Sequence, residues 1–92
     1  MKLVTVNHRH HGYRTWKFFL QFGPRGYLKT EQVKYNRAFT QLYGADRKLK
    51  PHDPNVIVWN NWEYNQNWRN DGKRFRIYYN NESDLSAVTL LI

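Results

Sequence analysis

The strongest constraint on the fold is the Asp71-Gly72 pair, which lies between two runs of alternating apolar and polar residues within residues 62–79. Both central residues of a type I′ turn take positive φ, so an Asp-Gly pair in this setting predicts a two-residue hairpin turn. That turn would fix the strand register as Asn70/Lys73, Arg69/Arg74, Trp68/Phe75, Asn67/Arg76, Gln66/Ile77, Asn65/Tyr78 and Tyr64/Tyr79.

Side-chain alternation gives the predicted hairpin two unlike faces. The apolar side chains fall on one face, which we expect to be core: Trp62, Tyr64, Trp68, Phe75, Ile77 and Tyr79. The other face is rich in amides and arginines: Glu63, Asn65, Asn67, Arg69, Arg74, Arg76 and Tyr78. We expect this second face to meet solvent and to accept an anionic partner.

Two further strands are predicted earlier in the chain. Residues 2–6 alternate weakly, and residues 13–22 form a longer run after a polar segment that ends in Gly12. The even positions of the longer run share an apolar face: Trp16, Phe18, Leu20 and Phe22. Its odd positions are mixed, so we expect the opposite side to be half exposed: Tyr13, Thr15, Lys17, Phe19 and Gln21.

A helix is predicted over residues 30–43. Thr30 suits the N-cap, Glu31 lies in the first turn where the helix dipole favours an anion, and Gly44 suits the C′ position. One apolar stripe follows helical spacing: Tyr35, Ala38, Phe39, Leu42 and Tyr43. We expect this stripe to cover the apolar face of the sheet.

The segments on either side of the hairpin are less regular. A basic loop is expected at residues 47–50, and an apolar run at residues 56–59 leads into the long third strand. The end of the chain admits two interpretations. One is a helical turn within residues 82–87 followed by a closing strand at residues 88–92, and the other is one short helix over residues 84–91.

Together these elements predict a single α+β domain over residues 1–92. The element order is β-β-α-β-β with a short terminal element, which favours an antiparallel sheet of four to five strands with one helix packed on one face. The uncovered face of that sheet is where we expect function to reside.

The charge of the chain narrows its partners. A count of 15 Lys and Arg against 7 Asp and Glu gives a formal charge of +8, which favours nucleic acid, acidic proteins or anionic membrane. The sequence has no cysteine, no apolar run of signal-peptide length at its N-terminus and no membrane-length apolar stretch. We therefore expect a cytoplasmic protein without a membrane partner. Because no phosphate loop or nucleophile motif is present, we expect no catalysis and no cofactor.

Nucleic-acid binding is the first functional interpretation. Cationic residues interleaved with aromatic rings combine phosphate neutralisation with base stacking, which favours RNA or single-stranded DNA over sequence-specific duplex DNA. The predicted site residues are Arg69, Arg74, Arg76, Tyr78, Lys17, Arg14 and Tyr13. A secondary basic patch is predicted at Lys34, Arg37, Arg47, Lys48 and Lys50. The competing interpretation is structural, because basic side chains on an outer sheet face also maintain solubility and protect strand edges.

A protein-interaction role is the second interpretation. The chain contains 4 Trp and 7 Tyr, and these residues dominate interface hot spots together with Arg. Trp59 and Trp62 are candidate anchors. Such a protein would dock on an acidic surface of another protein as an inhibitor or adaptor. A homodimer through an exposed edge strand or through the third strand is a further alternative.

A metal-dependent nuclease is the third interpretation. His8 and His10 have the i, i+2 spacing that places two side chains on one face of a strand, where imidazoles bind Zn²⁺ or a similar ion. The acidic residues are scattered along the chain, and none lies near these histidines in the sequence. We therefore favour an ordinary loop at this position, without a metal site.

The last part of the sequence resembles the end of many small α+β proteins of tailed bacteriophages. The resemblance rests on residues 75–79 followed by residues 81–91, which read as a strand, a short acidic turn and a terminal apolar segment. It covers under a quarter of the chain. It implies a virus-encoded accessory or host-takeover protein in the host cytoplasm, a class that includes nucleic-acid binders and inhibitors of host or defence enzymes.

Overall fold

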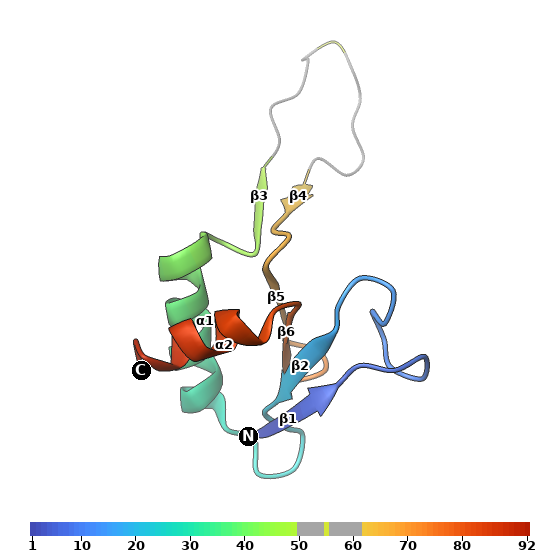
Figure 1. The fold of residues 1–92 in the computed structure, drawn as a ribbon, viewed down its shortest axis with the longest axis vertical. Helices are drawn as coiled ribbons and strands as arrows, with labels where there is room; N and C mark the ends of the chain where they lie inside the picture. Colours follow the sequence, from blue (N-terminus) through green and yellow to red (C-terminus); the bar gives the residue numbers. More distant parts are fainter. Residues whose placement is uncertain (50–54, 56–61) are drawn as a thin grey trace.

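A computed structural model describes residues 1–49, 55 and 62–92 of the chain. The elements of these residues are β1 (Lys2–Thr5), β2 (Phe18–Gln21), α1 (Lys29–Tyr43), β3 (Arg47–Leu49), β4 (Trp62–Tyr64), β5 (Trp68–Asp71), β6 (Arg76–Tyr79) and α2 (Glu82–Thr89). The fold is α+β, which confirms the class predicted from the sequence (Figure 1).

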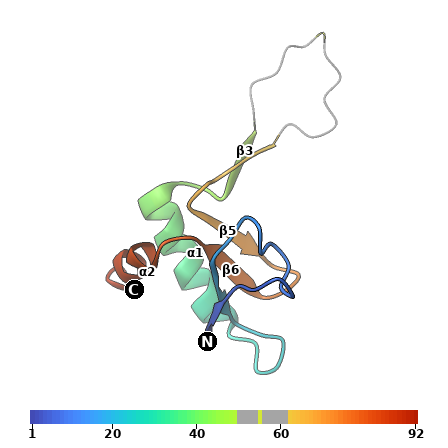
Figure 2. The same cartoon turned by 45° about the vertical axis from the view of Figure 1, so that its right-hand side comes forward.

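The strands form two antiparallel units. The main sheet has the order β1-β2-β6-β5, so β2 and β6 are its central strands. A separate hairpin of β3 and β4 extends away from this sheet along the long axis of the molecule (Figure 1). Both helices lie on the same side of the main sheet, as the turned view in Figure 2 also shows.

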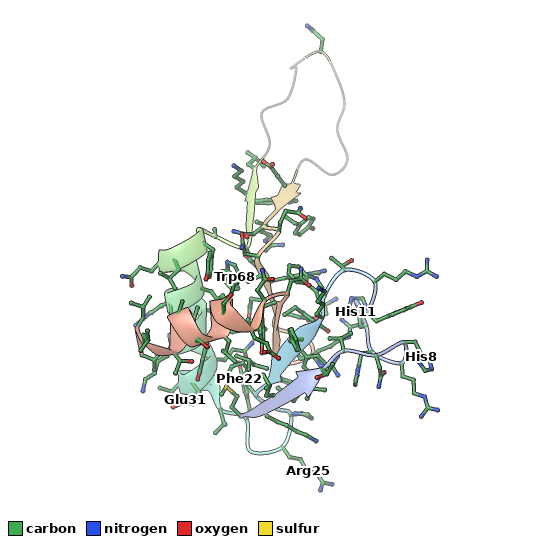
Figure 3. The ribbon with its side chains drawn as sticks, in the orientation of Figure 1. His8, His11, Phe22, Arg25, Glu31 and Trp68 are labelled. Atoms are coloured by element: carbon green, nitrogen blue, oxygen red, sulfur yellow. The ribbon has the colours of Figure 1, made fainter. Side chains whose placement is uncertain are left out.

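The main core lies between the sheet and the helices. Its buried residues are Leu20, Phe22, Tyr35, Ala38, Phe39, Trp68, Ile77, Tyr79 and Val88. The rings of Phe39 and Trp68 stack with their centroids 5.2 Å apart, and the indole N–H of Trp68 donates to the carbonyl of Gly44 at 2.9 Å. Figure 3 shows Trp68 and Phe22 within this layer. Burial also raises the pKa of the Tyr79 hydroxyl to about 12, and the nearby charge of Glu82 adds to the effect.

Helix α1 follows the prediction closely, with two differences. It begins at Lys29, and its N-cap is Leu28 rather than Thr30, without a side-chain cap. Gly44 directly follows the helix with φ 84°, as expected for a terminating glycine. The first three residues of the predicted apolar stripe, Tyr35, Ala38 and Phe39, are buried, but Leu42 is 41% exposed.

The turn between β5 and β6 differs from the predicted type I′ turn. Trp68 pairs with Tyr79 rather than with Phe75, so the register is shifted by four residues. Residues 72–75 form the turn. Positive φ occurs at Phe75 (57°), whereas the predicted turn required it at Asp71 and Gly72. The cause is the Asp71 carboxylate, which accepts hydrogen bonds from turn N–H groups and holds Asp71 in the strand. Because four is an even number, the side chains of β5 and β6 that pair with one another keep their predicted faces.

The predicted long third strand is interrupted after Tyr64. The Asn65 side chain donates to the carbonyls of Tyr43 and Ala45 and accepts from the N–H of Asn67, so the backbone leaves the strand path there. Residues 47–49, predicted as a loop, instead pair with β4 as strand β3. Two predictions lie outside the described residues. These are the apolar run at residues 56–59, which includes Trp59, and the basic residue Lys50.

The two ends of the chain also refine the predictions. The C-terminal segment is a helix, α2, rather than a turn and a closing strand. It adds a second helix to the one predicted for the helical layer. At the N-terminal end, the strand predicted over residues 13–22 begins only at Phe18, because residues 11–15 form turns.

The outer face of the sheet is covered rather than open. Trp16, Phe19 and Tyr78 form a second buried cluster, against which Val4 and Val6 pack. Phe19 was predicted on a half-exposed side and Trp16 in the main core, so both assignments were wrong. The reason is that the segment between β1 and β2 folds back and places Trp16 on the outer face.

Candidate nucleic-acid interface

The residues predicted to bind nucleic acid divide into three environments. Tyr78 is only 1% exposed, so its ring cannot receive a base. Arg76 packs over the ring of Phe19, with its guanidinium carbon 4.2 Å from the ring centroid. It also donates to the Gln21 side chain at 2.8 Å and to the Tyr78 hydroxyl at 3.2 Å. Arg76 and Tyr78 are therefore structural parts of the sheet.

Tyr13, Arg14 and Lys17 lie at a separate place near the start of β2. Together with Thr15, Trp16 and Asn80 they line a shallow cavity of ≈ 410 Å³. The Arg14 side chain donates to the Tyr13 hydroxyl at 3.1 Å and lies over its ring. The structure therefore keeps these three predicted residues together but apart from Arg69 and Arg74.

Arg69 and Arg74 line a large open cavity, which we call the hairpin groove. It has a volume of ≈ 710 Å³, within the usual range of ligand clefts. The groove is lined by His11, Asp46, Arg47, Tyr64, Arg69, Asn70, Asp71, Gly72, Lys73 and Arg74. The groove lies between the β3–β4 hairpin and the β5–β6 turn. We call its two sides the hairpin side and the turn side.

The hairpin side of the groove carries an aromatic surface. Arg47 is opposite Tyr64 and Leu49 is opposite Trp62 in the strand register, so these four side chains share one face of the hairpin, which we call the aromatic face. Arg47 and Tyr64 line the groove, and Leu49 and Trp62 continue the same face beyond it. Trp62 is 40% exposed and Tyr64 42% exposed, although both were predicted to be core. The interruption at Asn65 causes this difference, because it separates β4 from the sheet.

Two arginines lie against the rings of the aromatic face. The guanidinium carbon of Arg47 is 5.1 Å from the Trp62 ring centroid, and that of Arg69 is 5.6 Å from the Tyr64 ring centroid. Contacts of this kind hold a cation beside an aromatic surface. Within the described part of the chain, no carboxylate forms an ion pair with Arg47 or Arg69. Their charges therefore remain available to an anion.

The turn side of the groove is held by Asp71. Its carboxylate accepts from the backbone N–H groups of Lys73 and Arg74 and forms an ion pair with the Arg74 guanidinium at 3.0 Å. Burial by itself raises the pKa of Asp71. The hydrogen bonds from Arg74 and the charges of Arg74 and Arg69 outweigh burial and lower the pKa below its ordinary value. Asp71 therefore stays ionised and fixes the turn.

The second carboxylate of the groove is also engaged internally. Asp46 accepts from the backbone N–H of Asn70 at 3.1 Å, which protects this edge of β5. The Asn70 side chain in turn accepts from the amide of Gln32 on α1 at 2.9 Å. The four cations of the groove, Arg47, Arg69, Lys73 and Arg74, outnumber its two carboxylates, Asp46 and Asp71, so the groove keeps an excess of positive charge.

The predicted secondary basic patch is not one surface. Lys34 and Arg37 lie on α1 beside a different cavity of ≈ 300 Å³. Lys48 lies on the hairpin face opposite Arg47 and pairs with Glu63 at 3.6 Å. Among the members of this predicted patch that the structure describes, only Arg47 lines the hairpin groove.

The histidines do not have the strand geometry on which the metal interpretation rested. His8 and His10 lie in a turn region after β1. The Nδ1 atom of His10 accepts from the backbone N–H of Asn7, and its ring meets Phe19 edge-on at 5.1 Å. His8 lies at the outer end of this loop (Figure 3). Across residues 1–49, 55 and 62–92, no three His, Asp or Glu side chains gather as a metal site would require.

Sequence reasoning missed Tyr64, Asp46, Lys73 and His11 as groove residues. For Tyr64 a signal was present, because the polar run Asn65-Gln66-Asn67 marks a break in the strand. For Asp46 and His11 there was none, because they reach the groove only through tertiary contacts.

Comparison with protein-family models, curated proteins and solved structures finds no match for this chain in any of the three. Among the described helices, none has the length and apolar character needed to cross a membrane.

Proposed function

We propose that this protein is a non-enzymatic nucleic-acid-binding protein that takes RNA or single-stranded DNA in its hairpin groove. The observation that carries the proposal is the contact of the Arg69 guanidinium with the Tyr64 ring inside the groove, together with the contact of Arg47, which also lines the groove, with the neighbouring Trp62 ring. Proteins that bind single strands use this combination, since cations neutralise the phosphates while aromatic rings stack with the bases. The cysteine-free chain suits the reducing cytoplasm, where we propose that it acts.

The cations of the groove lie beside an aromatic ring, and this arrangement distinguishes them from the general positive charge of the surface. A charge of +8 spread evenly over a surface attracts any polyanion weakly, and such attraction disappears as salt is added. In the hairpin groove, the cations surround the exposed ring of Tyr64, which a base can contact, and the exposed Trp62 ring lies next to it on the same hairpin face. A groove with both features should bind at physiological salt, where generic attraction is weak.

The test compares two double variants that remove the same charge. Arg47→Ala with Arg69→Ala removes both cations from the aromatic face, and Lys34→Ala with Arg37→Ala removes two from α1. We expect the first to weaken binding of a labelled RNA or DNA single strand by at least about tenfold, since each lost phosphate contact and stacked cation contributes. We expect a change of no more than about twofold for the second.

The measurement is fluorescence anisotropy at low and near-physiological salt with single-stranded RNA, single-stranded DNA and duplex DNA. Circular dichroism of all variants would confirm that each is folded. Equal weakening by the two double variants, or binding seen only at low salt and equal for all three nucleic acids, would show generic attraction and contradict the proposal.

A protein partner is the second candidate function. It is favoured by Leu49, which is 59% exposed and lies opposite Trp62 on the aromatic face. An acidic protein surface with an apolar centre would complement Leu49 and Trp62 beside Arg47. In this case the protein would act as an inhibitor or adaptor, as the resemblance to bacteriophage proteins implied. Leu49→Ser would weaken such a complex but leave nucleic-acid binding little changed.

A further inference from the structure

We propose that the two sides of the hairpin groove bind different parts of one ligand, so that a single strand lies in a fixed orientation. Its bases face the aromatic face of the β3–β4 hairpin, and its phosphates follow the β5–β6 turn. This inference rests on the proposed function and adds to it a mode of binding, with the class of ligand that this mode requires.

The hairpin side is built to receive bases. Trp62 and Tyr64 are two residues apart on β4 and point to the same side, so their attachment points are separated by about 7 Å. This separation is about two steps of a stacked strand, at about 3.4 Å per nucleotide. A strand that contacts Tyr64 in the groove can therefore reach Trp62 with a base close by along the same strand, because Trp62 continues the aromatic face just beyond the groove. A duplex hides its base faces, so it cannot use these rings.

The turn side is built to receive phosphates. Lys73 and Arg74 are exposed at the turn, and their backbones are held by the same Asp71 carboxylate. The ion pair with Asp71 uses one terminal nitrogen of the Arg74 guanidinium, which leaves other N–H groups able to donate. Among the described residues that line the groove, those of the turn carry no ring. This side therefore offers a base no aromatic ring, whereas a phosphate meets two cations.

Asp71 thus acts as a positioning residue for the turn side. Its side chain is nearly fully buried, and it fixes the backbone that presents Lys73 and Arg74. Arg69 lies between the two sides, because it contacts the Tyr64 ring and belongs to the strand that ends at Asp71. The order across the groove is therefore ring, shared cation and then phosphate-binding turn.

The experiment uses the full chain and two DNA single strands of equal length. One is oligothymidylate, and the other carries abasic sites throughout its middle, so that its phosphates remain while the bases there are removed. The variants are Tyr64→Ala, with Tyr64→Phe as the control that keeps the ring, and Lys73→Ala, with Lys48→Ala as the control on the opposite hairpin face. Anisotropy titrations over a range of salt give both the affinity and its salt dependence.

We expect Tyr64→Ala to weaken binding of oligothymidylate by roughly 5- to 150-fold, the usual range for one stacked base, and to leave the abasic strand unchanged. Tyr64→Phe and Lys48→Ala should bind both strands like the parent. Lys73→Ala should weaken the binding of both strands alike. It should also reduce the magnitude of the slope of log affinity against log salt by about 1, as expected for the loss of one phosphate contact.

Two results would overturn the inference without touching the proposed function. One is equal weakening of both strands by Tyr64→Ala, and the other is an unchanged salt slope in Lys73→Ala, in each case with tight binding of the parent chain. If the parent chain binds neither these strands nor single-stranded RNA at physiological salt, the proposed function fails, and the inference fails with it.

Discussion

At the scale of single residues, Asp71 determines the turn that the sequence pattern misjudged. An Asp-Gly pair favours a two-residue turn when both residues take positive φ. In this chain the Asp71 side chain offers an alternative, because its oxygens accept from the N–H groups of Lys73 and Arg74. The longer turn gains these hydrogen bonds and an ion pair. It also places Trp68 opposite Tyr79 in the main core.

Replacement of Asp71 by Asn should therefore be destabilising. We expect Asp71→Asn to lower the free energy of unfolding at pH 7 by about 1–3 kcal/mol, as for the loss of a hydrogen bond to a charged group. Urea unfolding monitored by tryptophan fluorescence would measure the change. Asp46→Asn, at the other groove carboxylate, is the comparison variant, since Asp46 forms no ion pair with a described residue.

The pH dependence of this effect has a definite sign. The pKa of Asp71 is lower in the folded state than its unfolded value near 3.8, so folding favours the ionised form. The stabilisation is present above pH 3.8 and is lost as pH falls through the folded pKa. We expect the difference between the parent and Asp71→Asn to narrow below about pH 4. A difference that stays constant down to pH 2 would contradict this assignment.

At the scale of elements, Asn65 separates the β3–β4 hairpin from the main sheet. One side chain connects this point of the chain to the end of α1, because its amide donates to the carbonyls of Tyr43 and Ala45. The N–H of Asn65 also donates to the carbonyl of Asp46 at 2.8 Å. The hydrogen bonds of Asn65 therefore help to fix the direction in which the hairpin leaves the sheet.

Replacement of Asn65 by Ala should loosen this connection. Two backbone carbonyls and the N–H of Asn67 would lose their partner, so we expect a loss of about 1–3 kcal/mol in the free energy of unfolding. Gln66→Ala, next in the chain and exposed, should change it by less than about 0.5 kcal/mol. Thermal unfolding followed by circular dichroism would compare the two. Equal stability of both variants would show that Asn65 does not fix the hairpin.

At the scale of the whole molecule, the sheet is covered on both faces but by unlike layers. Helices α1 and α2 cover one face, and the segment between β1 and β2 covers part of the other through Trp16. Gly12 permits this second layer. It has φ 80°, and a Cβ atom at its position would lie 3.2 Å from Cδ1 of Trp16 and 3.8 Å from Cε1 of Tyr78.

Two glycine variants can measure how tightly this layer packs. Gly12→Ala and Gly26→Ala both place alanine at positive φ, which costs about 1–2 kcal/mol. Only Gly12 is crowded, since nothing lies within 4 Å of a Cβ atom at Gly26. We expect Gly12→Ala to cost at least about 1 kcal/mol more than Gly26→Ala in urea unfolding. Equal costs would mean that the segment can move off the sheet with little loss.

Much of the fold follows from local patterns, and the errors have physical causes. Period-two alternation placed Trp68, Ile77 and Tyr79 on the core face correctly, because a four-residue shift in register does not change faces. The same pattern placed Tyr64 in the core, since alternation cannot reveal that Asn65 bonds to residues about 20 positions away. Phe19 and Tyr78 were assigned to an open face, because only tertiary structure brings Trp16 over them.

The candidate site was predictable in its charge but not in its shape. Arg69 and Arg74 were identified from the sequence, and both line the hairpin groove. Arg76 and Tyr78 were identified by the same alternation, but the covering segment removes Tyr78 from solvent. The groove itself depends on where the β3–β4 hairpin leaves the sheet, which no local pattern records.

The adjacent tyrosines of β6 have a consequence for how the chain finds its strand register. Tyr78 points into the outer cluster and Tyr79 into the main core, so this one strand contributes a ring to each of the two buried clusters. A slip of one residue would exchange the two rings and misfit both clusters at once. The hydroxyl groups would make such a slip more destabilising. The Tyr78 hydroxyl accepts a hydrogen bond from the Arg76 guanidinium, whereas Tyr79 lies among apolar side chains. The two tyrosines of β6 therefore restrict the strand register, because only one alignment with the neighbouring strands fits both clusters.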